Sequence, residues 1–328
     1  MHNGHATSAG APWREPVRGG HPDPALAARP GIELLRAMLA RETPAPPLSR
    51  LTGMQPVRFS SRSARFDMPL SGWLCTEDGR VPLGVLTIPA DAAKACAIIA
   101  ELPAGVAITT TELALRQVGP ALPGRALRTE ATVIDVNPTS GGVALAEVTL
   151  TDDTGALIAR GGSLCVVLEL EDAGGGRADV DHSPGDTNTA GPDPWERPPP
   201  EAGLERLTGL RLVAVADGDA TFVLPATRWL CAPPPGRAQG GAVAMLAAAA
   251  IHAAMQTSAP AGGRFTPLEL KVNYLRPLAS DGREARAHAT LVHGGRRIAV
   301  ARAEVSDADG RAIAVASGSA IADGGASR

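Results

Sequence analysis

The chain has 328 residues, 44% hydrophobic and 20% charged, which is the mixture of a globular protein with about two domains. Its net charge of −3 is dispersed, without a basic cluster, so we expect no nucleic-acid partner. The longest apolar run, 242–255, is too short to cross a bilayer, and the first 30 residues lack the continuous apolar segment of a secretory signal. We therefore expect a cytoplasmic protein with no membrane partner.

Composition divides the chain into four parts. Residues 1–29 are rich in Gly, Pro and His, which predicts a disordered tail. A first domain is expected over 30–170, and it begins with an amphipathic helix at 31–41. Residues 171–200 have almost no aliphatic side chains and are predicted to be a linker. A second domain is expected over 201–323.

The two predicted domains show the same order of elements. Each has an alternating strand, then an apolar helix, then three or four further strands, which predicts an α+β fold. The second helix is apolar nearly all round and should be enclosed by the rest of its domain. The expected strands are 63–68 and 220–224, the helices 85–100 and 241–256, and the later strands of the second domain 265–275, 284–293, 296–305 and 311–321.

Short sequence matches show that the second domain repeats the first. Leu51-Thr52-Gly53 returns as Leu207-Thr208-Gly209, and Trp73-Leu74-Cys75 as Trp229-Leu230-Cys231, both at an offset of 156. Thr109 to Leu113 aligns with Thr266 to Leu270 at an offset of 157. Such a period is too long for a solenoid repeat, so each copy is a whole domain. Two diverged copies can differ in which parts of a site they keep.

The four cysteines do not indicate a metal site. They are scattered and form no C-x-x-C pair, so we expect no bound metal. Cys75 and Cys231 occupy equivalent positions of the two copies. They could form a disulfide across a pseudo-twofold axis, but two buried thiols in a reducing compartment are the favoured interpretation.

One enclosed helix wrapped by an antiparallel sheet of five or six strands is the hotdog architecture, so the fold class we expect is two tandem hotdog domains. The second copy contains Gln239-Gly240-Gly241 at its helix start and a strand from Thr266 to Pro277, TPLELKVNYLRP. These segments resemble the PaaI-like branch of hotdog acyl-CoA thioesterases, in which His-Gly-Gly opens the helix and Thr-x-x-Leu-x-Val-x-Tyr/Phe-x-Arg-Pro follows. The resemblance is clear over about 120 residues and weaker in the first copy.

The resemblance implies a site at the interface of two paired hotdog domains. Amide groups at the start of one helix polarise the thioester carbonyl, because an oxyanion develops there. A carboxylate on the other helix, nine residues after its own His position, activates water or attacks directly. Glycine at the helix start lets the backbone approach the substrate.

Carried over to this chain, the motif predicts one composite site. In the second copy Gln239 takes the His position, and the residue nine positions later is Ala248, which has no carboxylate. The first copy opens with Pro82-Leu83-Gly84, and nine residues after Pro82 stands Asp91. We expect Asp91 to face Gln239, Gly240 and Gly241 of the second copy, while the reciprocal site is inactive.

Further candidates follow from the same resemblance. Thr109 stands where the family often has a Ser or Thr that holds the nucleophilic water, with Thr266 as its counterpart on the inactive side. Three arginines are candidates for the phosphates of coenzyme A: Arg276, Arg296 and Arg297.

Structural explanations stand beside these roles. Asp91 could simply favour a helix dipole, and Pro89 must lie in the first turn or kink the helix. Gln239 could be only a helix cap, the two glycines could serve helix packing, and Thr109 could be only a strand former. His252 is interpreted as a core histidine.

The leading functional expectation is an acyl-CoA thioesterase, with no cofactor beyond the coenzyme A of its substrate. The alternative is a non-catalytic acyl-CoA or acyl-carrier binding protein, because the motif is eroded. A hydratase ranks last, because neither helix opens with His. We expect the two hotdog domains to pair within the chain, and the chain to form a further homodimer.

Overall fold

The computed structural model describes residues 10–170, 191–200 and 203–323. Within them, each sequence repeat folds into one long helix and six strands. The first copy comprises β1 (Gln55–Ser60), β2 (Ser63–Pro69), α4 (Leu83–Ile99), β3 (Val106–Gln117), β4 (Ala126–Val136), β5 (Val143–Asp152) and β6 (Leu157–Glu169). The second comprises β7 (Arg211–Ala216), β8 (Asp219–Pro225), α7 (Gly240–Gln256), β9 (Phe265–Tyr274), β10 (Glu284–Gly294), β11 (Ile298–Ser306) and β12 (Ala312–Ala322).

All strands join one antiparallel sheet whose two halves mirror each other. The order is β1-β2-β4-β5-β6-β3-β9-β12-β11-β10-β8-β7, so each strand of the first half has its repeat counterpart in the second. The halves meet where β3 pairs with β9, with Leu113 opposite Val272 and Leu115 opposite Leu270. This is a tandem pair of hotdog domains, as expected, related by a pseudo-twofold axis at the β3–β9 junction.

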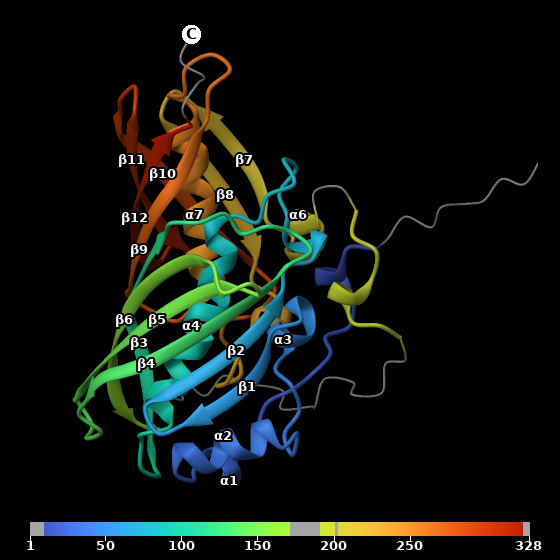
Figure 1. Cartoon of the computed structure of the whole chain (residues 1–328), viewed down its shortest axis with the longest axis vertical. Coiled ribbons are helices and arrows are strands. Elements are labelled where there is room, and N and C mark those ends of the chain that lie inside the picture. The colour runs from blue at the N-terminus through green and yellow to red at the C-terminus, as the bar shows by residue number, and fades with distance from the viewer. Residues whose placement is uncertain (1–9, 171–190, 201–202, 324–328) are drawn as a thin grey trace, which may run out of the picture.

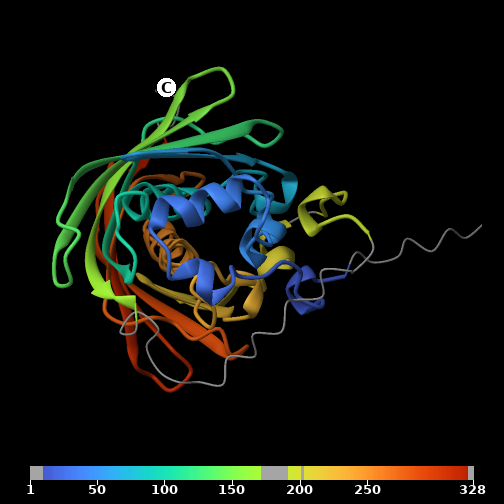
Figure 2. The same ribbon diagram turned by 90° about the horizontal axis from the view of Figure 1, so that it is seen from below.

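The sheet curves around the two long helices, which pack against each other inside it (Figures 1 and 2). Small and aliphatic side chains make this possible: Ala242, Ala244 and Ala247 on α7 are fully buried. The prediction of an enclosed second helix is confirmed. Pro89 lies in the second turn of α4, later than expected, and the α-helix continues through it to Ile99.

Smaller elements precede each copy and cover the rest of the core. They are η1 (Pro12–Arg14), α1 (Pro24–Ala27), α2 (Gly31–Leu39) and α3 (Pro47–Thr52) before and in the first copy, and η3 (Pro194–Glu196) and α6 (Gly203–Thr208) before and in the second; η2 (Gly72–Leu74) and η4 (Arg228–Leu230) carry the repeated tryptophans. The helix predicted at 31–41 is present as α2. The prediction of disorder over residues 1–29 is wrong for residues 10–29, which contain η1 and α1; residues 1–9 lie outside the described residues.

The segments around η1 and η3 each pack on the copy that they do not directly precede in the sequence. Trp13 lies against Gly209 of the second copy, and the indole of Trp229 donates a hydrogen bond to the carbonyl of Glu15 (3.1 Å). In the same way, Trp195 lies against Gly53 of the first copy, and Trp73 donates to the carbonyl of Arg197 (2.7 Å). Each segment therefore precedes one copy in the sequence and packs on the other.

The predicted linker and the cysteines can be placed in part. Residues 171–190 of the linker lie outside the described residues, whereas 191–200 contain η3 and its contacts. Cys75 and Cys231 are buried free thiols, as favoured from the sequence, and burial raises the pKa of both.

Candidate functional site

The site begins with the crossing of α4 and α7, which needs glycine at the start of both helices. A Cβ on Gly241 would lie 2.5 Å from the carbonyl oxygen of Thr87 and 2.7 Å from the Cα of Ile88. A Cβ on Gly84 would lie 3.0 Å from the Cα of Met245, the repeat counterpart of Ile88. Gly241 therefore has a packing role, and the same contact brings the start of α7 onto the second turn of α4.

Asp91 of α4 lies at the N-terminus of α7. The residue is 6% exposed, and Oδ2 accepts a hydrogen bond from the amide of Gly241 at 3.2 Å. The positive end of the α7 dipole favours a negative charge at this place. The structure thus brings together the two groups that the repeat predicts to combine, one from each copy.

Gln239 connects the same two helices in a different way. It is the N-cap residue of α7, but its side chain makes no cap hydrogen bond. Instead, Nε2 donates to the carbonyl of Ile88 at 3.0 Å. Oε1 is buried and accepts no hydrogen bond from the residues that the structure describes, so this acceptor is available to a water or ligand donor.

Gly240 faces the space between Asp91 and Tyr274. A Cβ at Gly240 would lie 3.1 Å from Asp91 Oδ2 and 3.3 Å from Tyr274 Cζ. The phenol of Tyr274 donates to the carbonyl of Gly240 at 2.8 Å. Burial, followed by the charge of Asp91, raises the pKa of Tyr274 well above its usual value, so the phenol stays a donor. Tyr274 belongs to the strand motif, but the sequence did not single it out as a site residue.

Sequence reasoning also missed Lys94, which lies one helical turn after Asp91. Its side chain is completely buried, and Nζ lies 2.9 Å from Asp91 Oδ1. The two carboxylate oxygens of Asp91 therefore face different partners, Oδ1 the ammonium and Oδ2 the Gly241 amide. The available signal was the spacing of Asp91 and Lys94, three residues apart in a largely apolar helix.

The threonine that reaches this cluster is Thr110, not the predicted Thr109. Thr110 Oγ1 accepts a hydrogen bond from Lys94 Nζ at 2.8 Å. Successive side chains of a strand point to opposite faces, so the face of β3 that carries Thr110 is not that of Thr109.

The reciprocal crossing carries apolar contacts in place of this cluster. A Cβ on Gly84 would lie 3.0 Å from the methyl of Ala248, the counterpart of Asp91. Thr266 hydrogen-bonds instead to Asp323 near the other end of the sheet. The two sides of the pseudo-twofold axis thus differ in chemistry although they share one backbone plan.

The candidate arginines are divided between the two ends of β9. Arg276 is exposed and stands two residues after Tyr274, so it lies beyond the end of β9, whose Tyr274 bonds to Gly240. Its guanidinium donates to the carbonyl of Ala312 at 2.9 Å. Arg296 and Arg297 are exposed in the β10–β11 hairpin, beside the start of β9. The length of β9, about 30 Å, separates them from Tyr274. The structure therefore does not bring Arg296 and Arg297 to the Asp91 cluster.

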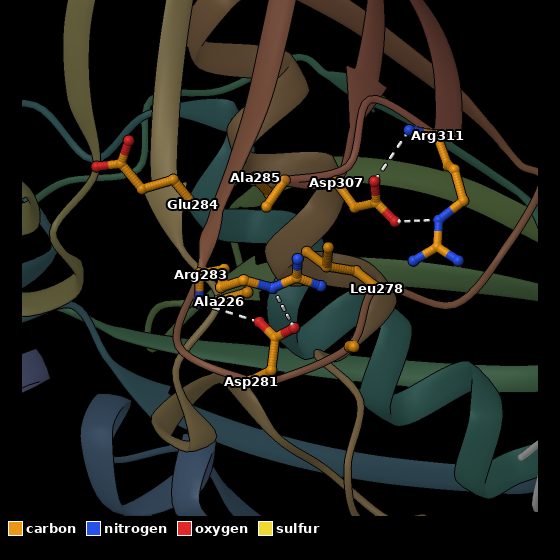
Figure 3. A pocket seen from close by; sticks show the side chains of 10 residues that line it. Ala226, Leu278, Asp281, Arg283, Glu284, Ala285, Asp307 and Arg311 are labelled. Carbon is orange, nitrogen blue, oxygen red and sulfur yellow. Dashed lines mark hydrogen bonds and ion pairs between the residues drawn. The ribbon is translucent and has the colours of Figure 1, made fainter. Parts of the chain in front are cut away.

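A recess beside Leu278 offers no competing site (Figure 3). Its charged side chains are paired: Arg283 with Asp281 at 2.7 Å, Arg311 with Asp307 at 2.9 Å, and Glu284 with Arg211 on β7 at 2.6 Å. None of the residues predicted for the site lines it.

The comparisons with known proteins agree with this fold. Residues 236–314 match the model of the thioesterase superfamily. Among solved structures, the tesB protein of Mycobacterium avium subspecies paratuberculosis superposes with a TM-score of 0.56 and 14% identity, covering 84% of this chain and 98% of that one. Acyl-CoA thioesterase II TesB2 of Mycobacterium marinum gives 0.55 and 10%, with 86% and 98% covered. A hotdog-fold protein of unknown function from Alicyclobacillus acidocaldarius gives 0.53 and 14%, with 85% and 98% covered.

The tandem hotdog fold and the resemblance of the second copy to the thioesterase superfamily are therefore both established. The PaaI-like branch stays a prediction. A search of curated proteins finds none that matches this chain. Among the described residues, the helices are all too short or too polar to span a membrane.

Proposed function

We propose that the chain hydrolyses an acyl thioester at one composite site, formed by Asp91 of the first copy and the start of α7 in the second. The observation that supports this most directly is the 3.2 Å hydrogen bond from the Gly241 amide to Asp91 Oδ2. It places a carboxylate and a helix N-terminus within reach of one small functional group. Water attack on a thioester needs both.

The chemistry follows from the two groups. Asp91 accepts a proton from water, or attacks the carbonyl carbon itself, and the amides of Gly240 and Gly241 stabilise the oxyanion. When the tetrahedral intermediate collapses, the C–S bond breaks and the thiolate leaves with the proton that Asp91 took from water. If Asp91 attacks instead, the collapse leaves an acyl anhydride on Asp91; a water molecule then hydrolyses it, which restores the carboxylate and supplies the thiolate's proton. The products are a carboxylic acid and a free thiol. Gln239 Oε1 supplies an acceptor that orients the water.

Acyl-CoA is the proposed substrate class. The superfamily match and the acyl-CoA thioesterase among the structural relatives support this choice. Arg276 is exposed to solvent and stands two residues after Tyr274 of the site. We therefore propose that it binds a phosphate of coenzyme A. Arg296 and Arg297 lie in the β10–β11 hairpin, beside the opposite end of β9.

Substrate binding requires a rearrangement at Gly241. In the structure the Gly241 amide already donates to Asp91, so a thioester oxygen must replace Oδ2 there. The carboxylate then lies beside the carbonyl carbon that it is to attack or hydrate. The partial exposure of Gly240 makes it the side from which the carbonyl approaches.

Thiol release from a panel of acyl-CoAs tests the proposal. We expect the wild-type chain to turn over at least one acyl-CoA, and Asp91→Ala to reduce kcat by ~10²–10⁴-fold, the usual range for a lost base. The matched control is Ala248→Ser at the repeat counterpart, which should leave kcat unchanged. An Asp91→Ala variant that is as active as the wild type would show that the site is elsewhere.

A second candidate function is acyl-CoA binding without turnover. The observation that favours it is that both oxygens of Asp91 already have partners, Lys94 and Gly241. Calorimetry with a nonhydrolysable acyl-CoA analogue, run beside the activity panel, separates the two functions. Binding without thiol release would establish the second.

A further inference from the structure

Lys94 is a buried cation that the strands of the first copy hold in place. Its ammonium donates to Thr110 Oγ1 on β3 at 2.8 Å and to Ser163 Oγ on β6 at 2.7 Å, and it faces Asp91 Oδ1 at 2.9 Å. Cys165 Sγ on β6 also lies 3.9 Å from Nζ. Ser163 in turn donates to the carbonyl of Glu112 at 2.6 Å. The position of Nζ is therefore fixed by two strands of the sheet.

The second copy shows that the fold does not need this polar group. At the offset of 157, Asp91 corresponds to Ala248 and Lys94 to Ile251. Strand pairing shows that Gly318 is the counterpart of Ser163. Leu113 and Leu270 are equivalent at the same offset, and Leu113 pairs with Ser163 whereas Leu270 pairs with Gly318. The second copy therefore has three apolar residues where the first has three polar ones.

The apolar version packs in the same place. A Cβ added to Gly318 would lie 2.9 Å from Cγ2 of Ile251, so Ile251 fills the space against its strand that Lys94 and Ser163 share in the first copy. Burying an ion pair costs desolvation free energy, and apolar residues of similar volume usually replace it without loss of stability. The first copy thus keeps a costly pair that stability alone does not require.

We propose that Lys94 is the positioning residue for Asp91, an inference that rests on the proposed thioesterase function. Substrate must take the Gly241 amide from Asp91 Oδ2, so Asp91 loses one of its two partners when the thioester binds. Lys94 is the partner that stays, and it keeps Oδ2 directed at the water. The water's proton goes to Oδ2, while Lys94 keeps all its protons and exchanges none.

The test replaces the first copy's residues with those of the second. The double variant Lys94→Ile, Ser163→Gly retains Asp91 and reproduces packing that this fold already contains. We expect it to fold, with KM within about threefold of the wild type and kcat lowered by about 100-fold, within the range for a misplaced base. The triple variant that adds Asp91→Ala is the matched control with the complete apolar set; it should be at least as stable as the double variant, and inactive.

Chemical rescue distinguishes positioning from a structural role. Lys94→Ala removes a propylammonium-sized part of the side chain, so added propylammonium should restore part of kcat, whereas 1-propanol should not. Lost packing alone would be repaired equally by both or by neither.

Several results would overturn the inference. The first is a double variant with the same kcat as an active wild type. This result would overturn the role of Lys94 but would not contradict the thioesterase function. The second concerns the free energy of unfolding. Residues that contact each other have coupled effects on it, so the effect of Asp91→Ala should not simply add to that of the Lys94→Ile, Ser163→Gly pair; additive effects would overturn the inference. If the wild type hydrolyses no acyl thioester although the residues are coupled, the proposed function fails and Lys94 is only a structural counter-ion.

Discussion

At the scale of single residues, the repeat located Asp91 but not its partners. Asp91 could be predicted because it stands nine residues after Pro82, where the resemblance places a carboxylate, while the repeat counterpart Ala248 has none. Lys94 was missed because hydrophobic periodicity does not reveal where one lysine in an apolar helix points. Thr109 was chosen over Thr110 because the alignment of a Thr run is uncertain by one position, and one position reverses the face of a strand.

His252 gives a prediction for acid stability. It lies on α7, with Nε2 3.1 Å from Gln256 Nε2 and Nδ1 buried. Burial, followed by the charge of Arg264, lowers its pKa from 6.5 to about 4. Between these two pH values the unfolded chain binds the proton and the folded chain does not, so the free energy of unfolding should fall as the pH drops from 6.5 towards 4.

The loss should be at most about 3 kcal/mol. Urea denaturation at pH 7.5 and at pH 4.5 measures it, with His252→Gln as the control that lacks the titrating group. The same pH dependence in both proteins would assign the loss to other residues.

At the scale of elements, exposure decides which strands a sequence reveals. The predicted strands alternate between buried residues and partly or fully exposed ones, as in β2 and β10. The two strands that were not predicted, β1 and β7, form the edges of the sheet and are largely exposed along their length. Without a buried face they lack the alternation on which the prediction depends.

The helix crossing gives a prediction for its two glycines. Alanine should gain up to about 1 kcal/mol in helix propensity at either position. At Gly241 the new Cβ would meet backbone atoms of α4 at 2.5 Å, so Gly241→Ala should destabilise the protein by a net ~1–3 kcal/mol. At Gly84 the shortest contact is 3.0 Å, so Gly84→Ala should cost clearly less. Urea denaturation of both variants compares them; equal losses would mean that the contact does not set the cost.

At the scale of the whole molecule, the pairing of the repeats could be predicted, but the segments that fasten them could not. Pro12-Trp13 and Pro194-Trp195 are a second, shorter repeat within stretches whose composition indicates a tail and a linker. Composition reports the average polarity of such a stretch and overlooks one half-buried tryptophan. A bidentate ion pair, with distances of 2.6 and 2.8 Å, joins Glu15 to Arg197 and so connects the two segments.

The exchange of these segments predicts which copy each tryptophan protects. Trp13 precedes the first copy but packs on Gly209, so Trp13→Ala should speed amide hydrogen exchange in residues 203–231 of the second copy. Trp195 packs on Gly53, so Trp195→Ala should speed exchange in residues 47–75 of the first. Each variant is the control for the other, and mass spectrometry of peptides from both copies measures the effect. If each substitution instead loosened the copy that follows it in sequence, the exchanged arrangement would be wrong. If the predicted pattern is found, neither copy is complete without the segment that precedes the other.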